Sequence, residues 1–125
     1  MLSDAQQFIL NNNADWIQPF VLNSYDPSTN LRSSFDLTGC TLKMTIIGPS
    51  SGHPSQLIST SNGYITITNA ATGAFTIHVP APTMWNLPAA TYVGDMLIFQ
   101  SNGDVLLAFS CELTIEAGDT APVYP

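Results

Sequence analysis

The chain has 125 residues, only 9% of them charged, and its formal net charge of −7 comes from nine acidic residues against two basic ones, Arg32 and Lys43. Binding to nucleic acid or to an anionic membrane needs clustered lysine and arginine, so this composition argues against both partners and against an acidic substrate. The 45% hydrophobic content is enough to fold one domain, and the sparse charge fits either a surface covered by partners or a monomer solvated by Ser, Thr and Asn.

Residues 1–14 are predicted to form an N-terminal arm. Ser3 followed by Gln6 fits a helix capping box, and the segment DAQQFIL is long enough for about two helical turns before the asparagine run at 11–13. A helix this short is marginal in water, so we expect it to dock through Phe8, Ile9 and Leu10.

The start of the chain has neither the basic region nor the long apolar core of a secretory signal. No apolar run approaches the roughly 18 residues of a membrane-spanning helix. We therefore expect synthesis in a reducing cytosol with Cys40 and Cys111 as free thiols, a disulfide between them being the alternative.

From Asp15 to residue 117, short runs of alternating hydrophobicity are separated by turn-forming residues. This spacing predicts an all-β domain, an antiparallel β-sandwich of the immunoglobulin-like or Greek-key type with about seven strands. Residues 23–34 are expected to be a loop, residues 83–87 one helical turn with Trp85 plugging the sandwich end, and residues 118–125 a polar tail. The expected strands are DWIQPFVL, CTLKMTII, LIST, YITIT, AFTIHV, TYVGDMLIFQ and DVLLAFSCELTIE. Cys40 and Cys111 fall on the inward side of their strands, so both thiols are expected to be buried and unreactive.

The segment LIFQSNGDVLLAFS, residues 97–110, is predicted to be a hairpin that turns at Asn102-Gly103, a dipeptide that tolerates positive φ at both positions. Both of its faces are apolar, whereas an ordinary hairpin has one polar face. Strict alternation places Ile98, Leu107 and Phe109 on the inner face. The outer face then contains Val93, Leu97, Phe99, Leu106 and Ala108.

An apolar patch of this kind on a monomer usually marks an interaction site. A subunit contact is the favoured cover, and it predicts an interface made of that outer set together with Phe8, Ile9 and Leu10. The alternative is internal cover, in which the N-terminal segment or Trp16 and Ile17 fold over the patch.

No residue set points to catalysis, a metal or a cofactor. His53 and His78 have no second histidine or carboxylate at a ligand-like spacing, so both are expected to be surface side chains. The acidic residues are scattered singly, without the facing pair of a glycosidase or the alternating carboxylates of a calcium loop. We therefore expect a protein that is not an enzyme and that holds no cofactor.

An ordered set of turn and strand motifs carries a resemblance to a known family. The set runs from a DLTG turn and a strand with Lys43 and Met44, through a TG hairpin and a proline-rich turn, to LPAATY, Asp95 and an NGD turn. It resembles small β-sandwich domains in virion proteins of tailed bacteriophages and prophages, especially tail and baseplate components. Those domains carry LPAGTY and Asp-Leu where this chain has LPAATY and Asp95-Met96. The resemblance covers residues 15–117, and its motifs set turns and carry no catalytic group.

The resemblance implies a non-enzymatic structural component of a tailed-phage virion, located in the tail or baseplate or serving as a fibre adaptor, and assembled in the host cytoplasm. Its partners would be copies of itself and other virion proteins. A capsid decoration or head–tail joining protein is the nearest alternative. From a different class, a small carbohydrate-binding module would use Trp85, Tyr64 and Tyr25 as an exposed aromatic platform. A hydrolase is the third hypothesis, and no residues support it.

Overall fold

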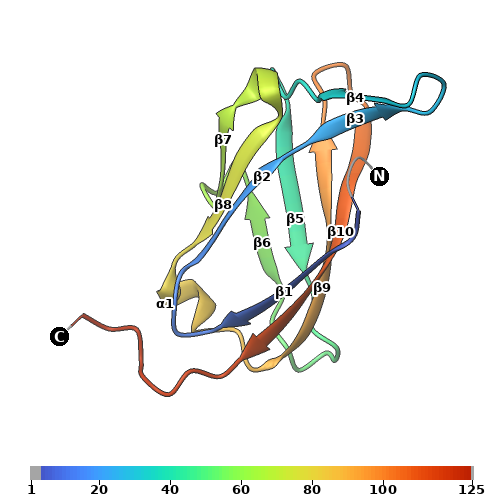
Figure 1. Ribbon diagram of the computed structural model, residues 1–125. Coiled ribbons are helices and arrows are strands. Elements are labelled where there is room, and N and C mark those ends of the chain that lie inside the picture. Colours follow the sequence, from blue (N-terminus) through green and yellow to red (C-terminus); the bar gives the residue numbers. More distant parts are fainter. Residues whose placement is uncertain (1–3, 125) are drawn as a thin grey trace.

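The computed structural model describes residues 4–124, which form a β-sandwich with a projecting hairpin at one end (Figure 1). The only helical segments in this range are a 3₁₀ turn (Ala70–Thr72) and the one-turn helix α1 (Ala81–Met84), so no helix there is long enough to cross a membrane. The strands are β1 (Gln6–Asn11), β2 (Trp16–Val21), β3 (Asn23–Asp26), β4 (Leu31–Ser34), β5 (Thr41–Ile46), β6 (Gln56–Ser59), β7 (Ile65–Asn69), β8 (Ala74–Val79), β9 (Ala90–Phe99) and β10 (Val105–Glu116).

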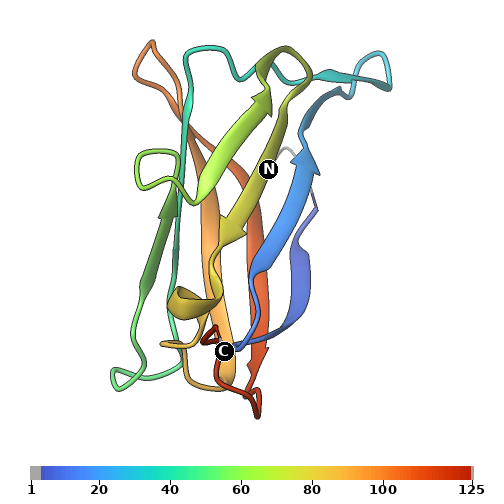
Figure 2. The ribbon, with the colours of Figure 1, turned by 90° about the vertical axis from the view of Figure 1, so that its left-hand side faces the viewer.

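Two sheets pack face to face, as Figure 2 shows from the side of β7 and β8. The large sheet has the order β1-β10-β9-β5-β6, and the small sheet has the order β2-β8-β7. Every pairing is antiparallel except that of β1 with β10, which is parallel. The neighbours β5 and β6, β7 and β8, and β9 and β10 each pair within one sheet, and the chain changes sheet between these pairs. The predicted antiparallel β-sandwich is therefore confirmed.

Tyr92 fixes the start of β9. Its side chain is fully buried, and its hydroxyl donates a hydrogen bond of 2.8 Å to the carbonyl of Pro88 in the preceding turn. A tyrosine in this place, bonded back to the chain a few residues upstream, is the tyrosine corner of immunoglobulin-type sandwiches. The LPAATY motif thus has a structural role, because it ties the turn to the central strand.

Aromatic side chains fill the middle of the core. Phe20 on β2 stacks between Phe75 and Phe109, with ring centroids 5.1 and 5.0 Å away, so it joins the two sheets. Phe8 on β1 packs against Phe20 and Trp16 at 6.0 and 5.6 Å. These aromatic contacts therefore connect the small sheet with β1 and β10 of the large sheet.

The two cysteines differ in burial. Cys111 is free and buried, with its Sγ 3.3 Å from the Sδ of Met44, and burial raises its pKa to about 11. Cys40 is also free, but it is only half-buried, which corrects the prediction that both thiols are buried. Burial and then the nearby Asp36 carboxylate raise the pKa of the Cys40 thiol.

The predicted N-terminal helix is wrong, because residues 6–11 form strand β1 beside β10; Ser3 of the expected capping box lies outside the described residues. Phe8 and Leu10 alternate with exposed Gln7 and Ile9, so a strand buries both apolar side chains against the core. The edge of β10 also supplies backbone hydrogen-bond partners, which an isolated short helix lacks in water. β1 therefore belongs to the sandwich and is not a separate arm.

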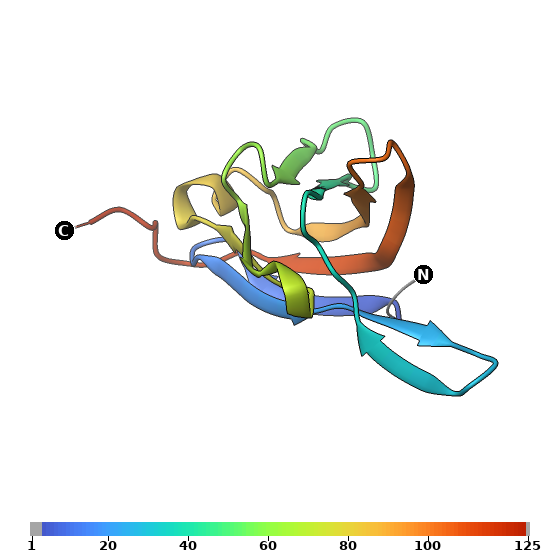
Figure 3. The same ribbon diagram turned by 90° about the horizontal axis from the view of Figure 1, so that it is seen from above.

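Residues 23–34, expected to be a loop, form the two-stranded hairpin of β3 and β4. The two strands pair with each other, and Figure 3 shows the hairpin projecting beyond both sheets. The Oδ1 atom of Asp26 accepts hydrogen bonds from the backbone N–H and the hydroxyl of Ser28, and Asn30 closes the turn with a φ of +57°. The turn formers that indicated a loop therefore build a hairpin tip.

Candidate functional site

The β9–β10 hairpin contains a β-bulge that decides which side chains point outward. Leu107 pairs with Leu97, but Phe109 pairs with Met96, so Ala108 is an extra residue without a partner. A bulge inserts one residue into a strand and thereby inverts the alternation on either side of it. The assignment of faces along β10 therefore changes at Ala108.

Because of this bulge, two residues predicted on the outer face, Leu106 and Ala108, lie on the inner side. Ala108 is fully buried, and Leu106 is directly opposite Ile98 and packs against the core. Leu107, predicted to be internal, is 37% exposed, and Val105 is 52% exposed. Phe109 is buried, as predicted, because it follows the bulge.

We define the outer face as six apolar side chains of the large sheet, which lie on β9, on β10 and just beyond the end of β5. Leu97 is directly opposite Leu107, and Phe99 is opposite Val105, so each pair shares the outer face. A backbone bridge joins Ile47 to Val93, and their side chains are 55% and 53% exposed. The members of the outer face are Ile47, Val93, Leu97, Phe99, Val105 and Leu107.

The N-terminal segment does not cover this face. Phe8 and Leu10 turn inward and pack against the core, Trp16 is buried, and Ile9 is 75% exposed on β1. Ile17, the other proposed cover, is exposed on β2 in the small sheet. Internal cover is therefore wrong, and the outer face is open within residues 4–124.

The outer face is hollowed into a groove of about 510 Å³ beside β1. Gly94 lies at its floor, where a Cβ atom would come within 2.8 Å of the carbonyl oxygen of Thr45, so glycine lets β9 approach β5 closely. Lys43, Asp95 and Glu112 are the charged residues that line the groove, and Asp95 accepts a hydrogen bond of 2.7 Å from the Ser110 hydroxyl. The groove thus combines apolar walls with one ammonium and two carboxylates.

A second hollow, of about 660 Å³, lies at the end of the sandwich that carries α1. Trp85 and Tyr124 line it, and Trp85 is 40% exposed, so it does not plug the sandwich as predicted. Met84 and Leu87, which flank Trp85 in the sequence, are buried instead.

The aromatic platform expected for carbohydrate binding is not assembled. The Tyr64 hydroxyl is hydrogen-bonded to the Thr83 hydroxyl at 2.9 Å. Tyr25 lies on the β3–β4 hairpin, at the end of the sandwich opposite α1 and Trp85 (Figure 1). The three aromatic residues therefore do not share one surface.

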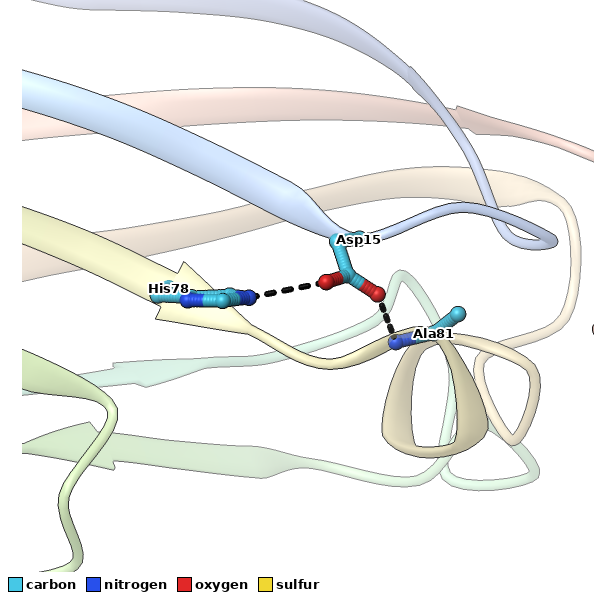
Figure 4. Close-up of polar contacts among 3 residues, drawn as sticks. All are labelled: Asp15, His78 and Ala81. Atoms are coloured by element: carbon cyan, nitrogen blue, oxygen red, sulfur yellow. Dashed lines mark hydrogen bonds and ion pairs between the residues drawn. The ribbon is translucent and has the colours of Figure 1, made fainter.

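Asp15 and His78 form a surface pair that the sequence pattern did not indicate. The Nε2 atom of His78 donates to Asp15 Oδ2 at 2.8 Å, and the backbone N–H of Ala81 donates to Asp15 Oδ1 at 2.7 Å (Figure 4). The bond from His78, and then that from Ala81, lower the pKa of the Asp15 carboxyl. Both side chains are about half exposed, and the contact links β2 to the start of α1. No group of three or more potential metal ligands occurs within the described residues.

His53, predicted to be a surface side chain, is half-buried. Its Nδ1 atom is hydrogen-bonded to the Ser50 hydroxyl at 2.8 Å, and its ring meets Tyr92 edge-on at 6.0 Å. It packs the loop after β5 onto the sandwich and has no carboxylate partner among the described residues.

No family model matches the chain, and no curated protein matches it. Among solved structures, one of murine CRIg aligns over 89% of this chain and 92% of its own chain, with 12% sequence identity and a TM-score of 0.39. A likeness at this level carries no argument about function.

Proposed function

We propose that this chain is a non-enzymatic structural component of a tailed-phage virion that assembles in multiple copies through the outer face of its large sheet. The observation that carries the proposal is the open outer face, where Ile47 and Val93 are each more than half exposed beside a groove. A contiguous, exposed apolar surface rimmed by polar groups is typical of a protein–protein contact.

The ordered turn and strand motifs between residues 36 and 104 support a role in the tail of a phage particle. They resemble those of tail and baseplate β-sandwich domains, so the tail, the baseplate or a fibre adaptor is the preferred location. A capsid decoration or head–tail joining protein would use the same surface. Antibodies against this chain, applied to intact particles in the electron microscope, distinguish these positions: label at the tail tip supports the proposal, and label on the head contradicts it.

The energy available from the outer face is modest. Burying a fully exposed Val, Leu or Ile side chain gains about 1.5–3 kcal/mol, and these side chains are already partly covered. Association itself costs about 4–15 kcal/mol. The face therefore needs additional contacts to hold copies together, as in a ring where each copy has two neighbours.

Two matched variants test the assembly. Val93→Asp places a carboxylate in the middle of the outer face, and Ile17→Asp places one on the small sheet, where the replaced side chain is 57% exposed compared with 53% for Val93. Burying an unpaired carboxylate costs several kcal/mol, so Val93→Asp should yield a folded monomer, whereas Ile17→Asp should assemble like the parent protein. Sedimentation and thermal melting measure both properties.

The result contradicts the proposal if Val93→Asp remains oligomeric or if both variants dissociate equally. A large loss of thermal stability in Val93→Asp alone would indicate that the side chain belongs to the core, which is also contrary to the proposal.

A carbohydrate-binding module is the second candidate, and one observation favours it. Trp85 and Tyr124 lie beside Asn13 and Asp15 in the hollow next to α1, and an exposed aromatic ring near polar groups is suited to a sugar ring. However, hydrogen bonds to His78 and Ala81 already occupy both oxygens of Asp15. A glycan that binds the parent protein and not Trp85→Ala would support this function, and equal retention of glycans by both would contradict it.

A further inference from the structure

We infer that the occupant of the outer-face groove is the β3–β4 hairpin of a second copy of this chain. The inference rests on the proposed function, because it names the partner of the same surface. The hairpin would reach from one copy into the groove of the next, with its Tyr25–Arg32 side facing the groove.

Beyond its half-buried base at Asn23 and Ser24, the hairpin has little support from its own sandwich. β3 and β4 pair only with each other, all four residues of β4 are exposed, and Leu31 at the end of the turn is 66% exposed. A single two-stranded hairpin is marginally stable in water unless a further strand or surface packs against it. A neighbouring copy would supply that surface.

Local hydrogen bonds nonetheless hold the tip of the hairpin in shape. The Tyr25 hydroxyl donates a hydrogen bond to the side chain of Asn30, and Asp26 caps the turn through Ser28. A segment that already has its bound shape loses less entropy on docking than a flexible loop does. These contacts suit a docking element.

Charge indicates where the hairpin binds. A chain with a net charge of −7 repels its own copies, and Arg32 and Lys43 are its only basic side chains. The Arg32 guanidinium lies over the ring of Tyr25 at 5.8 Å and forms no ion pair with a carboxylate of residues 4–124. It is therefore available to a carboxylate on another copy.

The groove offers the complementary charge. Asp95 and Glu112 line it together with Lys43, so the carboxylates outnumber the ammonium, and neither carboxylate forms an ion pair within the described residues. Tyr25 is 52% exposed and supplies an aromatic surface for the apolar wall formed by Ile47 and Val93. Cross-strand pairing places Tyr25 and Arg32 on one side of the hairpin, so both can face the groove together.

The contact would be head-to-tail. The hairpin projects from one end of the sandwich (Figures 1 and 3), whereas the groove lies on the large sheet. Each copy therefore has one free hairpin and one free groove. Repetition of a head-to-tail contact generates a closed ring or an open filament. Such growth fits a component present in multiple copies.

A charge swap tests the inference. Arg32→Glu should weaken self-association at least about tenfold, because close interfacial charge pairs couple strongly, and Glu112→Arg should weaken it as well. The double variant Arg32→Glu/Glu112→Arg should recover association, since the pair is restored with reversed signs. Ser33→Glu is the matched control: it adds a carboxylate on the opposite side of the same hairpin and should assemble like the parent.

Sedimentation equilibrium over a concentration series measures these constants, and thermal melting checks that each variant is folded. If Arg32→Glu associates like the parent while Val93→Asp is monomeric, the hairpin is not the occupant of the groove. The proposed contact through the outer face would then still stand. The inference is also overturned if Arg32→Glu loses association and the double variant does not recover it. That result is expected if the hairpins of two copies bind each other and not the groove. A parent protein that is monomeric at every concentration would overturn both proposals.

Discussion

The two hairpins of this molecule have similar turns and opposite surroundings. The β9–β10 hairpin closes with Gly103 at a φ of +94°, and the β3–β4 hairpin closes with Asn30 at +57°, each in the left-handed region at the last loop position. β9 and β10 lie in the middle of the large sheet and bury one face, whereas β3 and β4 project from the body and bury almost nothing. Turn chemistry therefore specifies a hairpin, and apolar alternation decides whether that hairpin belongs to the core or is presented to a partner.

The largest expected difference between the two hairpins concerns packing. Phe109→Ala on β10 removes a ring that stacks on Phe20, and truncation of a buried phenylalanine costs about 3–5 kcal/mol. Leu31→Ala on β4 removes an exposed side chain, so the free energy of unfolding should change by less than about 0.5 kcal/mol. Denaturant unfolding of the monomer measures both, and equal losses would contradict the difference in surroundings.

The buried thiol of β10 gives a pH dependence. Because burial raises the folded-state pKa of Cys111 to about 11, above its ordinary value of 9.0, its contribution to stability is complete below pH 9. That contribution should be lost as the pH rises through 11, where the loss reaches about 2 kcal/mol. Stability measured between pH 8 and 11 tests this, with Cys111→Ala as the control in which this part of the slope should vanish.

The smallest effect compares the two turns. Gly103→Ala forces a side chain into the left-handed region, which should cost about 1 kcal/mol, since β9 and β10 are part of the cooperative core. Asn30→Ala should disturb only the local order of the projecting hairpin and leave the melting temperature of the sandwich unchanged. Thermal melting and the amide NMR spectrum report the global and local effects, and a matching drop in melting temperature for both variants would show that the hairpins are coupled.

Features set by nearby residues could be predicted from the sequence. The Asn102-Gly103 turn was predicted at the right place, although only Gly103 has a positive φ, because the loop has three residues between paired Gln100 and Asp104. The inward position of Ile98 was also predicted, since β9 alternates without interruption.

Features set by distant residues or by one extra residue could not be predicted. The bulge at Ala108 leaves no sign in an apolar run, so alternation assigned Leu106 and Leu107 to the wrong faces. β1 becomes a strand because its partner, β10, lies about one hundred positions along the chain, and residues 6–10 by themselves fit a helix as well. The contact of Asp15 with His78 spans 63 positions and has no local signal.

Hydroxyl-radical footprinting tests the central claim, that the outer face of the large sheet is the contact between copies. It measures the solvent access of individual side chains in the dilute monomer and at concentrations where copies associate. Oxidation of Val93, Leu97, Phe99 and Leu107 should fall on assembly, whereas oxidation of Ile17 and Val21 on the small sheet should stay constant. Constant oxidation of the outer face, or protection confined to Ile17 and Val21, would contradict the account.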